Sequence, residues 1–461
     1  MLSPEKSELK RGLNLFDATM LVVGSMIGSG IFIAPSLIAG YVQTPGLIIL
    51  IWVVGGLLTV FGSLSYAELA AAMPRTGGQY VFLREAYSPL WGFLYGWTLF
   101  LVIQTGFIAA VAVAFAKYLG VFIPSLSESN VVFSFQNFTI NSAQIIAIIS
   151  IVLLSVINIF GVKLGAAVQN IFTVSKVAAL ASLIGVSFIV GNGSLSNFTP
   201  VLTPIIPEAL GLSLFAAIAV AMSKALFAYD AWNSVTFTAE EIKHPEKNLP
   251  RALVIGTAAT AIIYTLTTMA YIYIVPVEQM ATVADNRIAA EVAQIVFGPA
   301  GLVFITAAIL ISTFGCNNGL ILAGPRVYYA MANDKLFFEK VKTVHTKFKT
   351  PAVSLVYQCV WACLLTLTGT YSDLLTYTAF ASLLFGVLTI VGLFVLRKKL
   401  PGLNRPYKTW SYPVVPALYV LGALFFIVFI FIGDLRNSGL GLAIIIAGIP
   451  AYFYLKSRNN G

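Results

Sequence analysis

Charged residues are scarce in this sequence. They make up 10% of its 461 residues, while hydrophobic residues make up 59%. A soluble domain carries about 25% charged residues. A larger core cannot explain the deficit, because a surface in contact with water would still need polar cover. The scarcity excludes an ordinary soluble protein and predicts a chain embedded in a lipid bilayer.

Histidine and cysteine are scarcer still. The chain has two histidines, both in expected loops, and three cysteines, Cys316, Cys359 and Cys363, all in expected membrane spans. Cysteines in such positions act as small apolar fillers rather than as a disulfide framework or a metal site. The spans also hold no nucleophile paired with a base. We therefore expect no enzyme activity, no cofactor and no bound metal.

Long apolar runs are abundant, and a run of about 20 apolar residues crosses about 30 Å of hydrocarbon. With turn residues and charge clusters taken as helix ends, the sequence predicts an all-α integral membrane protein with twelve transmembrane helices. Residues 1–15 form a mixed-charge tail without a cleavage site, so the first span is retained rather than removed as a signal peptide. The expected spans are 16–42, 46–73, 89–119, 142–160, 164–190, 209–238, 250–275, 296–326, 351–369, 374–396, 411–432 and 438–455.

Basic residues fix the direction of these spans. The chain has 27 Lys and Arg against 18 Asp and Glu, for a net charge of +9. One side's loops hold only Arg287 and Arg436, and Lys117, Lys176 and Lys224 fall within spans, so the other side carries all the rest. By the positive-inside rule, both termini are cytoplasmic and the protein lies in the cell membrane. Because the positive charge is spread over many separate segments, we expect no nucleic-acid partner.

Two of the spans are interrupted. The first carries Gly24, Gly28 and Gly30 at its centre, and the sixth carries polar and aromatic residues over 225–234. Five helices separate the starts of these spans, and they run in opposite directions. Interrupted helices at matching positions of two inverted halves point to the central site of a transporter. The sequence thus predicts a first five-helix repeat over 16–190, a second over 209–396, and helices 11 and 12 over 411–455.

The break in the first span suits an anion. Unwound backbone inside a bilayer is tolerated where it is buried or lines a cavity, and glycine lets the backbone approach a ligand closely. The free N–H groups around Gly28, Ser29 and Gly30, at the start of the outer half-helix, suit a carboxylate. Helix packing is the competing interpretation, because Gly24 and Gly28 form a small-residue contact motif.

The break in the sixth span suits a cation. Interruption near Phe227 and Asp230 would free carbonyl groups to accept hydrogen bonds from a substrate ammonium. Phe227 could close over the ligand from the external side, although core packing is the usual role of an aromatic residue in such a helix. Core packing does not explain Asp230, because an ionisable residue at this depth in a membrane indicates a functional site by default.

Two further charged residues stand out. Lys176 lies about 18 Å into its span at 1.5 Å per residue. It is either a structural cation bonded to carbonyls of the interrupted first helix or a titrating group for proton coupling, unless the span is misplaced and Lys176 lies near an interface. Glu68, near the cytoplasmic end of the second span, is either part of an inner gate or a plain helix-end acid.

Several segments together resemble the amino acid–polyamine–organocation superfamily, and within it the L-type amino acid transporter branch and its bacterial serine/threonine-exchanger relatives. These segments occur in both halves of the chain. They are Gly24–Phe32, Tyr66–Leu69, Pro74–Tyr80, Val168–Lys176, Phe227–Asn233, Glu240–Ile242 and Asn248–Arg251. The chain departs from the mammalian heteromeric branch at Asp230 and Ala231, where that branch carries glycines, and an acid there would permit a more polar or basic substrate.

The resemblance implies a five-plus-five inverted fold and a role for each break. Ser29 and Gly30, with Gly28, would hold the substrate carboxylate; the carbonyls of Met26, Phe227 and Asp230 would receive its amine; Phe227 would be the external gate; and Lys176 would stand in for a sodium ion. We expect the pocket to be completed by Ser25, Ala228, Ala231, Trp232 and Asn233.

The implied function is sodium-independent transport of small neutral L-amino acids by alternating access, with exchange favoured. The alternatives are a proton-coupled symporter of broad or cationic specificity and, from another class, a non-transporting amino-acid sensor. The external loop after the third span carries no cysteine. We therefore expect no obligatory disulfide-linked subunit, so that the partners are the L-amino acid and the bilayer.

Overall fold

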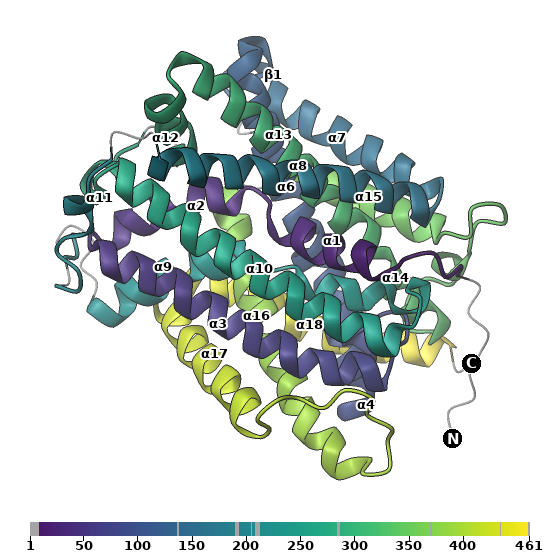
Figure 1. Ribbon diagram of the computed structural model, residues 1–461. Helices are drawn as coiled ribbons and strands as arrows, with labels where there is room; N and C mark the ends of the chain where they lie inside the picture. The colour runs from purple at the N-terminus through teal and green to yellow at the C-terminus, as the bar shows by residue number, and fades with distance from the viewer. Residues whose placement is uncertain are drawn as a thin grey trace.

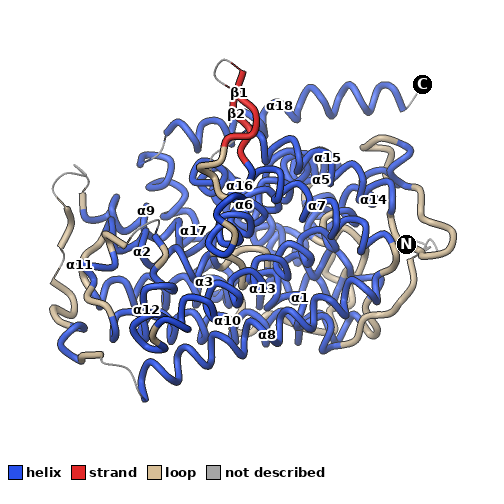
Figure 2. The backbone as a smooth tube through the Cα atoms, turned by 90° about the horizontal axis from the view of Figure 1, so that it is seen from above, coloured by secondary structure: helices blue, strands red, loops and turns tan. Residues whose placement is uncertain are grey.

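The fold is a bundle of long helices with one small hairpin (Figures 1 and 2). The computed structural model describes residues 9–135, 138–189, 193–203, 205–207, 213–283, 286–368, 371–433 and 435–459. Within these ranges the only strands paired in a sheet are β1 (Val131–Phe135) and β2 (Phe138–Asn141), which are antiparallel. The prediction of an all-α membrane fold is confirmed in class.

The first half of the chain contains eight α-helices and a π-helical segment. In order they are α1 (Leu15–Met26), α2 (Gly30–Tyr41), α3 (Pro45–Ala72), α4 (Gln79–Ala86), α5 (Pro89–Thr98), the π-helical η1 (Leu99–Ile103), α6 (Gln104–Phe122), α7 (Ser142–Ile159) and α8 (Val162–Ile189), with the short η2 (Pro124–Leu126) before the hairpin.

The second half of the chain is also helical. Its elements are η3 (Leu195–Phe198), α9 (Leu214–Ala228), η5 (Trp232–Glu241), α10 (Pro245–Ile274), α11 (Val277–Met280), α12 (Ile288–Phe297), α13 (Pro299–Ala323), α14 (Pro325–Asn333), η7 (Glu339–Lys342), α15 (Ala352–Thr368), α16 (Tyr371–Lys399), α17 (Val414–Gly433) and α18 (Leu435–Asn459).

Local sequence explains where several helices begin. The side chain of Asn14 accepts from the backbone N–H of Asp17, while Asp17 accepts from the N–H of Asn14, which is a capping box that starts α1. Asn141 and Gln144 start α7 in the same way. Other helices begin with proline at the first helical position, where its missing N–H costs nothing; these are α3, α5, α10, α13 and α14.

Eleven helices of the described chain are long and apolar enough to cross a membrane. Helix α15, which occupies the predicted ninth span, is shorter at 17 residues. The structure thus shows a multi-pass membrane protein, and the count of twelve spans stays a prediction. So do the repeat boundaries at 16–190 and 209–396, of which residues 190 and 209–212 lie outside the described residues, as do residues 1–8 of the predicted tail.

Both predicted interruptions are present. The first span is divided into α1 and α2 by residues 27–29, and the sixth into α9 and η5 by residues 229–231. The third span contains a feature that the sequence did not predict, the π-helical segment η1 between α5 and α6. A π-helical segment inside an α-helix often accompanies a functional site.

Most of the basic loops meet at one end of the bundle, which we call the basic end. It includes α4 and α14, which lie at the right of Figure 1, whereas α11 and α12 lie at the left. At this end the segment before α1 pairs with the end of η5: Leu13 forms a parallel bridge with Ile242, and the N–H groups of Gly12 and Leu13 donate to the Glu241 carbonyl at 2.8 and 2.9 Å. The orientation of this end in the membrane remains a prediction.

Candidate functional site

The two helix breaks touch one another. A β-carbon placed on Gly30 would lie 2.6 Å from the β-carbon of Ala228, which is closer than two carbons approach, so only glycine fits at this crossing. Ala231 adopts a left-handed backbone with φ of 69°, which turns the chain between α9 and η5. The two interrupted segments therefore form one structural centre.

The glycines before the first break pack against neighbouring helices. A β-carbon at Gly24 would collide with Gln169 and Thr173 of α8, and one at Gly28 would lie 2.9 Å from the sulfur of Cys316 in α13. The packing interpretation of this motif therefore holds for Gly24 and Gly28. It does not compete with a binding role for the break itself, because the same close packing places the unwound backbone beside α8 and α13.

Lys176 lies against the first break and is fully buried. Its Nζ donates to the carbonyl oxygens of Gly24 at 2.7 Å, Ile27 at 2.6 Å and Ser312 at 3.2 Å. The Ser312 hydroxyl lies 3.0 Å from the Ile27 carbonyl oxygen and 3.2 Å from that of Gly28. Together, side chains of α8 and α13 satisfy carbonyls that the break removes from regular helical bonding.

Tyr264 of α10 connects the two breaks, and sequence reasoning missed it. Its hydroxyl lies 2.7 Å from the carbonyl oxygen of Met26 and 3.1 Å from that of Ala228. Its ring packs edge-on against Trp52, with centroids 5.4 Å apart. A lone tyrosine in an apolar helix has no sequence signal that separates this role from core packing.

A small cavity lies at the breaks and brings together most of the predicted pocket. Its lining also includes two residues of α6 and two of α13 that the sequence did not assign to the pocket. The lining residues are Ser25, Met26, Gly28, Ser29, Gly30, Phe227, Ala228, Asp230 and Ala231, with Phe107, Val111, Cys316 and Leu320. Trp232 and Asn233, also expected in the pocket, line neighbouring cavities instead.

Two stacked phenylalanines border this cavity. The rings of Phe107 and Phe227 are nearly parallel, at 19°, with centroids 4.8 Å apart. The cavity leaves about 20 Å³ for the centres of water-sized molecules, which is room for one or two waters. An amino acid can enter only if side chains such as Phe107 and Phe227 move.

Glu68 lies in the last turns of α3, close to the basic end, and is buried. Arg397 donates two hydrogen bonds to its carboxylate, at 2.9 and 2.6 Å, and the N–H of Thr409 donates a third at 2.7 Å. A second guanidinium, that of Arg405, lies 3.4 Å away. This carboxylate therefore ties α3 to the end of α16 and to the loop that follows it, through the basic and backbone groups that the inner-gate interpretation of Glu68 expects; the gating role itself stays a prediction.

A second buried ion pair lies at the same end. Arg326 donates to both oxygens of Glu241, at 2.7 and 3.0 Å, and both side chains are almost completely buried. This ion pair connects the start of α14 to the end of η5. Nearby, the hydroxyl of Tyr80 in α4 donates to Asp334 at 2.6 Å. Burial, and then the Asp334 carboxylate, raise the pKa of Tyr80 well above its usual range, so this hydroxyl stays a donor at physiological pH.

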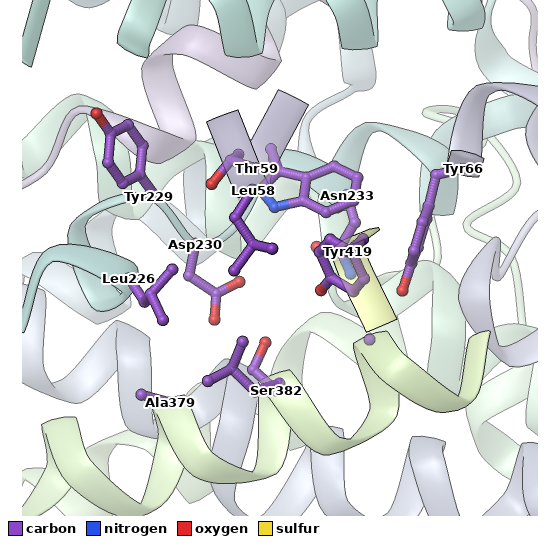
Figure 3. A pocket seen from close by; sticks show the side chains of 13 residues that line it. Leu58, Thr59, Tyr66, Leu226, Tyr229, Asp230, Asn233, Ala379, Ser382 and Tyr419 are labelled. Carbon is purple, nitrogen blue, oxygen red and sulfur yellow. The ribbon is translucent and has the colours of Figure 1, made fainter. Parts of the chain in front are cut away.

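Asp230 borders three cavities of the described structure. Besides the cavity at the breaks, it lines a second cavity with Gln79, Tyr95 and Gln104, and a third among α3, α9, η5, α16 and α17. Figure 3 shows its carboxylate pointing into the third cavity toward Ser382. Its oxygen accepts from the N–H of Ala231 at 2.6 Å and it hydrogen-bonds Ser382.

These features define a multi-pass membrane protein built around two broken helices whose breaks form a common site. Comparison with known proteins supplies the family: the amino acid permease family model matches residues 13–450. The chain belongs to the amino acid permease family, within the superfamily that its motifs resemble, and is therefore a permease rather than an enzyme.

Curated relatives match over nearly the whole chain. The serine/threonine exchanger SteT of Bacillus subtilis is 33% identical over 98% of this chain and 99% of its own length. The Asc-type amino acid transporter 1 of Mus musculus is 30% identical, over 97% and 82%. The large neutral amino acids transporter small subunit 2 of Homo sapiens is also 30% identical, over 96% and 80%. These relatives place the chain in the L-type branch.

Proposed function

We propose that this protein is a sodium-independent carrier of small neutral L-amino acids that works by alternating access, chiefly as an exchanger. The contact of Lys176 with the first helix break carries the proposal. Its ammonium supplies a fixed positive charge to carbonyl oxygens of Gly24 and Ile27, which are groups of the kind that coordinate a small cation in broken helices of other carriers. With that position occupied by Lys176, no sodium ion is needed there.

The substrate carboxylate would bind at the start of α2. The first N–H groups of a helix have no partners within it, and the positive end of the helix dipole attracts an anion. Gly28, Ser29 and Gly30 line the cavity at this point.

The substrate amine would bind among the carbonyls of Met26, Phe227 and Asp230. The Met26 carbonyl oxygen already accepts from the Gly28 N–H at 2.9 Å and from the Tyr264 hydroxyl. A hydroxyl has one proton to donate. When Tyr264 donates to Ala228 instead, the Met26 carbonyl regains a lone pair for the ammonium. Tyr264 would thus adjust both breaks to the ligand.

Two gates would enclose the site. Phe227, stacked on Phe107, would close the end away from the basic end, and movement of this pair would admit substrate. The pair formed by Glu68 and Arg397 would belong to the gate at the basic end, with both chain termini on the cytoplasmic side. In alternating access the two gates open in turn.

Uptake by the purified protein in proteoliposomes tests this function. We expect saturable uptake of radiolabelled neutral L-amino acids without sodium, accelerated when the vesicles contain unlabelled amino acid. Competition by each of the twenty amino acids would then define the substrates. No saturable counterflow of any amino acid would reject the proposal, and stimulation by a sodium gradient would reject its sodium independence.

The same assay separates the alternatives. A proton-coupled symporter would accumulate substrate in response to an inward proton gradient with empty vesicles, and a sensor would bind amino acids without moving them. The human relative is named as a small subunit, which points to an assembly in that protein. For this chain we propose a carrier without an obligatory disulfide-linked partner. Full activity of the purified single chain would support that, and activity only with a second protein would contradict it.

A further inference from the structure

The cavity among α3, α9, η5, α16 and α17, which we call the side cavity, is separate from the proposed substrate site. Asp230 is the one residue that lines both of them. The side cavity leaves about 40 Å³ for the centres of water-sized molecules, which is enough to hold several waters. Much of its lining is polar, and includes Thr59, Tyr66, Asn233 and Tyr419 (Figure 3).

The Asp230 carboxyl has no cationic neighbour among the described residues that line the three cavities. The titratable groups that face it there are Tyr66 from α3, Tyr95 from α5, Tyr229 from the break after α9, Cys316 from α13 and Tyr419 from α17. From α16 the uncharged Ser382 hydrogen-bonds the carboxyl group. None of these groups offers a positive charge.

Among the described residues no ion pair joins Asp230 to either of the two buried lysines, and its hydrogen-bond partners are Ala231 and Ser382. The ammonium of Lys176 donates to the carbonyl oxygens of Gly24, Ile27 and Ser312. Lys224 lies six residues before Asp230 on the same helix and is not among the lining residues of any of the three cavities. A carboxylate inside a membrane protein needs either a cation or a proton to offset its charge, unless water surrounds it.

We propose that Asp230 is a proton-binding site of the carrier, loaded from water in the side cavity, and that it must be protonated before the substrate-filled site can close. The inference rests on the proposed transport function. In this step one proton passes from hydronium to a carboxylate oxygen of Asp230, and water is released. Closure removes water from around the carboxylate, which favours the neutral acid, and a zwitterionic substrate brings no net charge that would offset it.

The requirement gives exchange a defined pH dependence. In one-for-one exchange the proton accompanies substrate in each direction, so no net proton movement follows. The exchange rate is full at low pH, where Asp230 is protonated, and falls as the pH rises. Above the midpoint it falls about tenfold per pH unit, as expected for a single required proton.

The test compares exchange by the wild type with that of Asp230→Asn and Asp230→Glu, from about pH 5 to about pH 9, a range that covers buried carboxyl groups. Asparagine mimics the neutral acid, so we expect Asp230→Asn to exchange substrate at a rate that no longer falls with pH. Asp230→Glu should keep a pH-dependent rate with a shifted midpoint. Glu339→Gln, which removes an exposed carboxylate at the basic end, is the matched control and should keep the wild-type profile.

Two results would overturn the proposal. One is an Asp230→Asn variant whose exchange rate falls with pH as the wild type does. The other is needed if Asp230→Asn is inserted but inactive, and it comes from proton uptake on addition of substrate in weakly buffered solution. The proposal expects such uptake by the wild type and none by the variant. Absence of that uptake in the wild type would reject proton binding at Asp230 while leaving the proposed exchange intact.

Discussion

The hydroxyl group of Tyr264 lies 2.7 Å from the carbonyl oxygen of Met26, at the end of the first half-helix of the bundle. The Ala228 carbonyl oxygen, at the end of α9, is 3.1 Å from the same hydroxyl. A single side chain of α10 thus contacts both broken helices. It offers a direct way to probe whether the two breaks act together.

We expect Tyr264→Phe to weaken substrate binding without preventing insertion. When the substrate amine occupies the Met26 carbonyl, the variant leaves the buried Ala228 carbonyl without the Tyr264 donor, at a cost of about 1–3 kcal/mol, which corresponds to a roughly 5- to 150-fold loss of affinity. Substrate titration of the purified protein measures it. Tyr271→Phe is the control, because the Tyr271 hydroxyl, seven residues along the same helix, has no partner among the described residues. Equal effects of the two variants would contradict the role of Tyr264.

Lys176→Ala should abolish exchange while the protein remains inserted. The variant leaves the carbonyls of Gly24 and Ile27 buried without their donor, and the unwound segment loses the charge that holds it in place. Exchange in proteoliposomes, with the amount of inserted protein measured in parallel, tests this. Lys163→Ala removes an exposed lysine from the start of the same helix and should exchange normally. Wild-type exchange by Lys176→Ala would show that the lysine is incidental.

Sequence patterns located the breaks but not the residues that join them. Gly24, Gly28 and Gly30 stand out in an apolar span, and Lys176 stands out because a charge at that depth is costly. Tyr264 and Phe107 do not stand out, because aromatic residues in unbroken helices are usually core. Their roles depend on which helices lie side by side, and that arrangement is fixed by long-range packing that no local pattern reports.

The charged residues divide in the same way. Glu68 was recognisable as unusual, but its partner Arg397 lies 329 positions along the chain. The pairing of Glu241 with Arg326 was not predicted either, although each residue lies near the end of an expected span. Ion pairs between distant helix ends require the tertiary fold, whereas the apolar spans and the two breaks follow from composition and local order.

Phe107→Ala should impair closure of the proposed outer gate. Offset-stacked aromatic pairs contribute about 0.5–1.5 kcal/mol beyond their burial, so we expect substrate to dissociate roughly 2- to 12-fold faster, with a similar effect for Phe227→Ala. Release of radiolabelled substrate from the loaded protein measures this rate. Phe115→Ala removes a ring from a different cross-helix pair, with Phe314, and should leave release unchanged. Slow release from all three variants would argue against this gate.

The ion pair of Glu68 and Arg397 should be far more sensitive to mutation than an exposed pair. Both carboxylate oxygens of Glu68 accept from Arg397, and the side chain is buried, so Glu68→Gln leaves the guanidinium of Arg397 without its counter-charge. Breaking a buried pair from one side costs about 3–5 kcal/mol. We therefore expect a clear fall in the unfolding temperature of the purified protein and loss of exchange.

The control for this variant is Glu339→Gln, which breaks the pair with Lys342 at the same end of the bundle. Its side chains are 84% and 48% exposed, and exposed pairs contribute about 0–1 kcal/mol, so the unfolding temperature should barely change. Combining Glu68→Gln with Arg397→Met distinguishes gate from scaffold. If the double variant regains stability without exchange, the pair serves the gate at the basic end. If stability and exchange return together, the unpaired charge alone caused the damage, and Glu68 has no gating role.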